Sequence, residues 1–308
     1  FFARRTALVN IAMLTAVTTA GFLLHWFEAQ AQVYWGFVVI FGIAGIARFY
    51  SAYQISCMYE PKVAEWLPLH KQLQGLGHSE FLRFSIFFAL LNFAVAIASP
   101  FFSVYMLRDL HFTYLEYSIN NASFMLMQFF TLTAWGRLTD TFGNRLVLIV
   151  TAIIIATLPA WWVMYANYWY FVGLQMLGGL CWAGFSLAAS NFLYDTVARE
   201  KRAAYSAVHH TITAIGVFLG ASLGGYLTTH LPSDMTIFGY DLANHSPIAG
   251  VFITSTIMRL GIVLAFLPLL GKVQPLRPIS LKSVTFCLWR FKRWPKLGLE
   301  LAILWKRK

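Results

Sequence analysis

Charged residues are scarce in this sequence, and their scarcity limits the class of protein to which it can belong. Asp, Glu, Lys and Arg make up 11% of the 308 residues, whereas a typical soluble domain carries about 25%. Hydrophobic residues make up 59% and aromatic residues 17%. This composition excludes an ordinary soluble domain and predicts an all-α polytopic membrane protein. The apolar segments must be helices, because lipid offers backbone groups no other hydrogen-bonding partners.

Cysteine is also scarce, and no acidic residue lies deep within an apolar run. Cys57, Cys181 and Cys287 are far apart and odd in number, so they outline neither a disulfide framework nor a zinc site. The net charge of +11 could suggest nucleic acid, but residues 271–308 hold ten Lys or Arg and one acidic residue. We expect this basic tail to contact anionic lipids. We expect no nucleic acid, metal or cofactor as a partner.

The apolar runs predict eight membrane-spanning helices, since each is near the length of about 20 residues that a span needs. They cover residues 6–27, 29–58, 84–107, 117–135, two helices within 146–194, 203–230 and 247–270. Aromatic residues gather near the middle of 146–194, which places a turn near Ala166 and Asn167. Gly216, Gly220 and Gly224 form a face of small residues that predicts close helix packing.

The distribution of Lys and Arg predicts the orientation of the chain. With both ends in the cytoplasm, that side receives 20 Lys and Arg, and the outside receives only Arg108. Arg48 and Arg259 lie within spans, where a charge is costly. We expect these two to snorkel or to pack between helices rather than to bind a substrate. The prediction is a multi-pass protein of the plasma (inner) membrane.

A short polar stretch, residues 136–145, separates two apolar runs and has the spacing G-x-x-x-D-x-x-G-x-R. We expect a tight loop here, in which Gly136 and Gly143 permit the turn. One interpretation of Asp140 is that its carboxylate caps the next helix, a role compatible with a functional one. The stretch resembles the cytoplasmic signature loop of the major facilitator superfamily of secondary transporters. That resemblance implies two six-helix bundles around a site at the membrane midplane. A weak internal repeat, at offsets of 203 and 211 residues, agrees with it.

On this resemblance the chain corresponds to the last eight helices of twelve, with further helices expected before Phe1. Residues 1–58 would end the N-terminal bundle, 59–83 would link the bundles, 84–270 would form the C-terminal bundle, and 271–308 would be a partly interfacial tail. The implied function is alternating-access transport of a small-molecule substrate by a monomer, without enzymatic activity. The substrate and a coupling proton or sodium ion stay open. The alternatives are a non-transporting sensor or scaffold and, less favoured, a membrane-embedded transferase.

Two groups of side chains are candidates for this function. The first is a cytoplasmic gate, in which the resemblance implies that Asp140 pairs with the opposite bundle. We also expect Asp195 to pair with Arg145 or Arg202. The members of the gate are Gly136, Asp140, Gly143, Arg145, Asp195, Arg202, Arg4 and Arg5.

The second group consists of polar or amphipathic residues on helix faces within the spans. They either join helices or line a cavity that hydrogen-bonds a solute. Its members are Asn10, Asn92, Ser99, Asn120, Asn121, Gln128, Gln175 and Trp182.

Overall fold

The computed structural model describes the backbone of residues 2–59, 80–198, 201–231, 236–237, 240–241 and 246–266. Side chains are described for residues 9, 12–59, 80–198, 201–231 and 246–266. Most of the predicted inter-bundle loop and the basic tail 271–308 therefore lie outside the described residues, as do the side chains of Arg4, Arg5 and Asn10.

The described chain is helical apart from short connections and one small β-hairpin, which confirms the predicted all-α class. The hairpin pairs β1 (Thr236–Ile237) with β2 (Tyr240–Asp241) in antiparallel register. The helices are α1 (Phe2–Ala29), α2 (Val33–Ser56), α4 (Glu80–Val104), the π-helical turn η2 (Tyr105–Asp109), α5 (Tyr114–Phe142), α6 (Asn144–Trp161), α7 (Tyr168–Asp195), α8 (Arg202–His230) and α9 (Pro247–Phe266).

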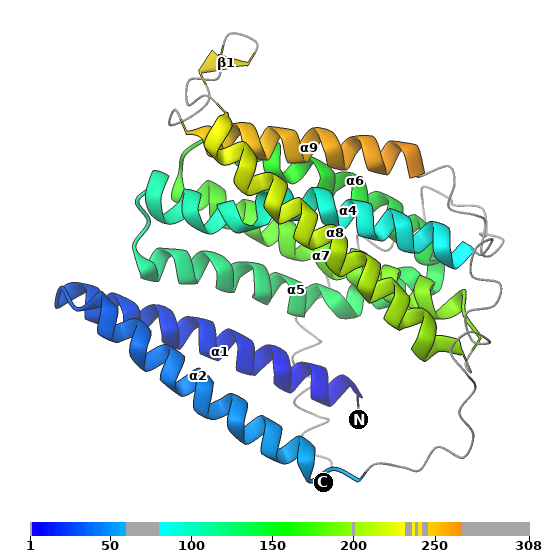
Figure 1. Ribbon diagram of the computed structural model, residues 1–308, viewed down its shortest axis with the longest axis horizontal. Helices are drawn as coiled ribbons and strands as arrows, with labels where there is room; N and C mark the ends of the chain where they lie inside the picture. Colours follow the sequence, from blue (N-terminus) through cyan, green and yellow to red (C-terminus); the bar gives the residue numbers. More distant parts are fainter. Residues whose placement is uncertain are drawn as a thin grey trace.

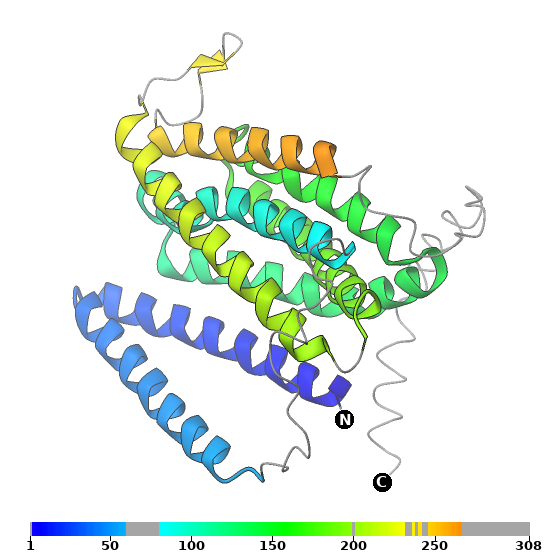
Figure 2. The same cartoon turned by 45° about the vertical axis from the view of Figure 1, so that its right-hand side comes forward.

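The long helices alternate in direction and form one bundle (Figure 1). Helix α4 packs on α8 and α9, α5 on α7 and α1, and α6 on α7 and α9. Figures 1 and 2 show α1 and α2 as a helical hairpin at one edge and α9 at the opposite edge. We call the end that carries residue 143 the Gly143 end, and the end that carries β1 and β2 the β-hairpin end. The starts of α1, α4, α6 and α8 lie at the Gly143 end.

Six of the described helical segments are long and apolar enough to cross a membrane. They are Val33–Ser56, Glu80–Asp109, Asn144–Trp161, Tyr168–Asp195, Arg202–His230 and Pro247–Phe266. The sequence predicted eight, and α1 and α5 have the length, at 28 and 29 residues, but are not among the six. Helix α5 packs between α1 and α7, so its polar residues can face other helices rather than lipid.

Local hydrogen bonds explain where two of the helices begin. Thr113 starts α5 with a capping box, in which its hydroxyl accepts from the backbone N–H of Glu116 and the Glu116 carboxylate accepts from the backbone N–H of Thr113. The Asn167 side chain accepts from the backbone N–H of Trp169 at 2.9 Å and so caps α7. The turn predicted near Asn167 is confirmed.

Glycines set the closest helix contacts, as predicted for α8. A Cβ at Gly216, Gly220 or Gly224 would lie 2.1–2.7 Å from backbone carbonyl oxygens of α4. A Cβ at Gly179 in α7 would lie 2.2 Å from the carbonyl oxygen of Phe124 in α5. Because the missing side chains allow these backbones to meet, α4 with α8 and α5 with α7 form two tight helix pairs.

Two apolar clusters form the core of the bundle. The larger one includes Phe84, Leu91, Leu148, Phe185 and Phe192, all at most 3% exposed. The smaller one joins the β-hairpin ends of α4, α6, α7 and α9. Its largest members are Tyr105, Met106, Trp162, Phe171 and Phe252.

Candidate functional site

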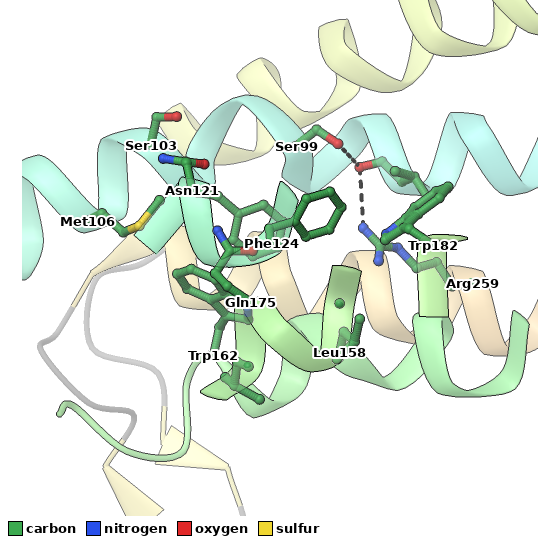
Figure 3. A pocket seen from close by; sticks show the side chains of 14 residues that line it. Ser99, Ser103, Met106, Asn121, Phe124, Leu158, Trp162, Gln175, Trp182 and Arg259 are labelled. Atoms are coloured by element: carbon green, nitrogen blue, oxygen red, sulfur yellow. Dashed lines mark hydrogen bonds between the residues drawn. The ribbon is translucent and has the colours of Figure 1, made fainter. Parts of the chain in front are cut away.

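A cavity of about 310 Å³ lies among α4, α5, α6, α7 and α9 (Figure 3). Its volume is at the lower end of the range for small-molecule pockets. On α5 and α7 the lining residues come from the half nearer the β-hairpin end. The aromatic lining residues are Phe102, Phe124, Trp162 and Trp182, and the polar ones are Ser99, Ser103, Asn121, Gln175 and Arg259.

Helix α4 places two hydroxyls at the cavity. Ser99 donates to the carbonyl oxygen of Val95 at 2.8 Å, one turn earlier on its own helix. Ser103 lies one turn later, and its hydroxyl is 2.9 Å from the Tyr117 hydroxyl of α5. The Ser103–Tyr117 contact joins the helices at the β-hairpin side of the cavity, whereas Ser99 is exposed.

Helices α5 and α7 supply the carboxamides. Asn121 donates to the carbonyl oxygen of Tyr117 at 2.9 Å, so its own amide oxygen is not used by that bond. Gln175 lies on α7 among the labelled side chains of the cavity in Figure 3. A carboxamide both donates and accepts, so these two side chains could hydrogen-bond a solute of either polarity.

Arg259 of α9 closes one side of the cavity from within the bundle. It is 3% exposed. Its guanidinium donates to the carbonyl oxygen of Ile155 in α6 at 3.1 Å and of Val95 in α4 at 3.3 Å. Pro159 lies four residues after Ile155 and has no N–H, so the Ile155 carbonyl lacks its usual helical donor. Arginine therefore supplies a hydrogen bond that proline removes from α6.

The structure brings together half of the predicted cavity residues. Ser99, Asn121, Gln175 and Trp182 line the cavity. Asn92, Asn120 and Gln128 do not, and the Asn10 side chain is outside the described residues. Asn92 donates to the Phe88 carbonyl of its own helix. Asn120 is fully buried, and neither amide atom has a hydrogen-bond partner among the described residues.

The contribution of Arg259 was missed by the sequence reasoning, which expected both intramembrane arginines to snorkel or pack. Arg259 does pack between helices, but it also lines the cavity, whereas Arg48 is exposed on α2. Arg48 and Arg259 correspond in the weak internal repeat at the offset of 211 residues, yet their environments differ. Pro159 in the sequence indicates that the carbonyl four residues earlier lacks a helical donor, but only the fold shows that Arg259 donates to it.

Helix α5 runs through most of the signature stretch, so the expected loop is reduced to one residue. Gly143 alone is non-helical between α5 and α6, with φ 85 and ψ 154. This conformation is open to glycine and strained for other residues, which confirms the turn predicted at Gly143. Gly136 lies inside α5, so the turn role predicted for it is wrong.

The acidic residue of the stretch does not cap the next helix. Asp140 is exposed in the last turn of α5, and the start of α6 has no side-chain cap. The capping role is therefore wrong, because the helix continues past Asp140. Among the described residues the ion pairs are His25–Glu28 and Arg108–Asp109, so Asp140 has no ionic partner there.

A polar cluster holds the ends of α6 and α7 together at the Gly143 end. The Asn144 amide donates to Asp195 at 3.0 Å and accepts from Asn191 at 3.1 Å. Asp195 therefore lacks the ion pair expected with Arg145 or Arg202 in this structure. Arg202 donates instead to the carbonyl oxygens of Tyr194 and Val197 near the end of α7, where a positive charge is favourable. The Nε of Arg145 is buried without a described partner.

The sequence profile of the family described as the Major Facilitator Superfamily matches residues 82–295. The chain belongs to this superfamily. The match includes every described helix from α5 to α9 and nearly all of α4. It confirms the resemblance that residues 136–145 carried, and with it a multi-pass membrane protein of a transporter family.

Two proteins with transport-related names align with part of the chain. A protein named "probable peptide/nitrate transporter" from Arabidopsis thaliana is 27% identical over 143 residues, which are 44% of this chain and 29% of that protein. Protein ZINC INDUCED FACILITATOR 1 from the same plant is 28% identical over 134 residues, 41% of this chain and 27% of that protein. The aligned part thus spans less than a third of either relative.

Proposed function

We propose that this protein is a secondary active transporter that moves a small solute through its cavity by alternating access. The observation that carries the proposal is the cavity of about 310 Å³ inside an apolar helix bundle. Ser99, Asn121 and Gln175 place polar groups at this cavity from three different helices, as expected for a site that hydrogen-bonds a solute.

The transport cycle would rest on two bundles that rock about this site. Residues 84–270 would form the C-terminal bundle, and α1 with α2 would end the N-terminal one, as their place at one edge supports (Figure 2). The Gly143 end would face the cytoplasm of a plasma (inner) membrane, because the positive charges near the helix ends gather there among the described residues. Arg83, Arg137, Arg145, Lys201 and Arg202 lie at that end, whereas Arg108 of η2 lies at the β-hairpin end.

The residues around Gly143 would form part of the cytoplasmic gate. Asp140 has no described ionic partner, and the Nε of Arg145 is buried without one. The start of α1, which carries Arg4 and Arg5 in its sequence, lies at the same end of the bundle (Figure 1). A contact between Asp140 and the start of α1 in the closed state would give this carboxylate a partner and hold the two bundles together.

Reconstitution tests the transport proposal directly. The purified complete protein in proteoliposomes should take up a labelled solute against its gradient when a proton or sodium gradient is imposed. Nitrate and small peptides belong in the first panel because of the name of one relative. A sensor or scaffold on the same fold would bind a solute without net flux. Binding without flux under either gradient would therefore favour that alternative and contradict ours.

The gate has its own test in cysteine accessibility. In each conformational state of the transport cycle, a Ser99→Cys variant should react with a membrane-impermeant thiol reagent applied from only one side of the membrane. Adding Asp140→Asn should raise its labelling from the cytoplasmic side, because the latch is weakened. Arg83→Gln, which removes an exposed charge at the start of α4, is the matched control. Equal labelling in both double variants would contradict the latch.

A further inference from the structure

Arg259 is a buried positive charge with no described carboxylate beside it. Its side chain is 3% exposed, and its Nε has no hydrogen-bond partner among the described residues. Six carboxylates have described side chains, and all lie at the ends of helices rather than at mid-bundle. They are Glu28, Glu80, Asp109, Glu116, Asp140 and Asp195. A guanidinium keeps its proton in proteins, and an uncompensated charge in this position is expensive.

The structural role of Arg259 does not account for this charge. Its two hydrogen bonds, to the carbonyl oxygens of Ile155 and Val95, use two of the five N–H donors that a guanidinium carries. A neutral side-chain amide also carries two N–H donors and avoids the cost of burying a charge. The positive charge therefore needs an explanation beyond the linkage of α4, α6 and α9.

The cavity supplies that explanation, because the guanidinium forms part of its wall (Figure 3). None of the lining residues is acidic, so Arg259 makes the cavity electropositive. Phe124, Trp162 and Trp182 give the same cavity aromatic surfaces, and Ser99 gives it a hydroxyl beside the guanidinium, since both donate to Val95. In surroundings of low dielectric constant, a single charge strongly favours an ion of opposite sign.

We propose that the cavity binds a small organic monoanion, with its carboxylate on Arg259 and its apolar body among the aromatic rings. Hydrogen bonds between a guanidinium and a carboxylate are among the strongest that side chains make. The proposal rests on the transport function proposed above and adds to it the charge class of the solute. It makes Arg259, which the sequence predicted to snorkel or to pack between helices, a specificity-determining residue.

Matched probes that differ only in charge test this assignment. Binding of radiolabelled indole-3-acetate to the complete protein in nanodiscs would be measured by competition with unlabelled indole-3-acetate, phenylacetate, benzoate, nitrate and the amide of each organic acid. At least one of the organic acids should bind about tenfold or more tightly than its amide. Nitrate should compete weakly, because it lacks an apolar body.

Variants at position 259 distinguish the effect of the positive charge from the effect of the hydrogen bonds that link the helices. Arg259→Lys should keep much of the preference for the acid, and Arg259→Gln, which keeps a neutral N–H donor group, should lose it. Arg48→Gln, which changes the exposed arginine of α2, should leave the preference unchanged. Thermal unfolding shows whether each variant folds. If Arg259→Gln does not fold, comparing the binding of each acid with that of its amide to the unaltered protein still tests whether the cavity prefers an anion.

Several results would overturn the proposal. They are equal or tighter binding of the amides, binding of none of the organic acids, or an acid preference that survives in folded Arg259→Gln. Flux of a neutral or cationic solute without anion binding would remove this inference and leave the transport function intact. Charge-selective binding without any flux would support the anion site and contradict the transport function.

Discussion

Replacing Gly220 by alanine should force α8 away from α4, because the two backbones meet at this residue. A Cβ there would lie 2.1 Å from the carbonyl oxygen of Phe93 and 3.0 Å from the Cβ of Ala96. The obstacle is helix backbone, which cannot rotate away as a side chain could, so the helices must separate by roughly 1 Å in a closely packed interior. Gly225 on the same helix has no atom within 4 Å of its Cβ position and provides the control.

Two opposing terms set the expected change in the free energy of unfolding. Alanine is preferred to glycine in a helix by about 1 kcal/mol, and both variants gain this. Overpacking costs about 1–3 kcal/mol, and it applies to Gly220 alone. Because rigid backbone places that cost at the upper end, we expect Gly220→Ala to lose about 2 kcal/mol and Gly225→Ala to lose nothing.

Thiol reactivity during heating can measure this difference. Cys181 is 1% exposed in α7 and should react only when the bundle opens, whereas Cys57 is exposed. Changing Cys57 and Cys287 to serine leaves Cys181 as the reporter. The midpoint for Gly220→Ala should fall by about 4–8 °C. Equal midpoints for the two alanine variants, or a lower one for Gly225→Ala, would refute the close-contact argument.

Three further predictions concern the junction, the cavity and the buried amide. Gly143→Ala should destabilise the fold by about 1–3 kcal/mol, because alanine is strained at the backbone angles of this residue. Gly136→Ala should not destabilise it, because the added Cβ would lie 4.0 Å from its nearest atom. Thermal unfolding of the two variants measures the difference. A cysteine at Ser99 should react with a small thiol reagent, whereas one at Ser255, 0% exposed, should remain unlabelled. Asn120→Leu should keep or raise stability, since both amide atoms lack described partners; a fall in the unfolding midpoint would show that this amide is satisfied.

The helices and their connections could largely be predicted from the sequence, whereas the contacts of polar residues could not. The turn at Asn167 and the glycine face that includes Gly220 follow from patterns within one segment. The stretch around Asp140 misled the prediction, because its polar residues continue α5 rather than forming a loop. The partner of Asp195 depends on Asn144, 51 positions earlier in the chain, and no local pattern indicates it.

By itself, the sequence determined that this is a polytopic helical membrane protein and indicated its superfamily, because hydrophobicity, the spacing of charges and a glycine at a turn act over a few residues. Only the tertiary structure decided that Arg259 points into the bundle. Its hydrogen bond reaches Ile155, 104 positions away, where Pro159 leaves a carbonyl without a donor. A charged side chain in an apolar span takes the orientation in which other helices offer it polar partners. For Arg259 that orientation places the side chain at the wall of a cavity.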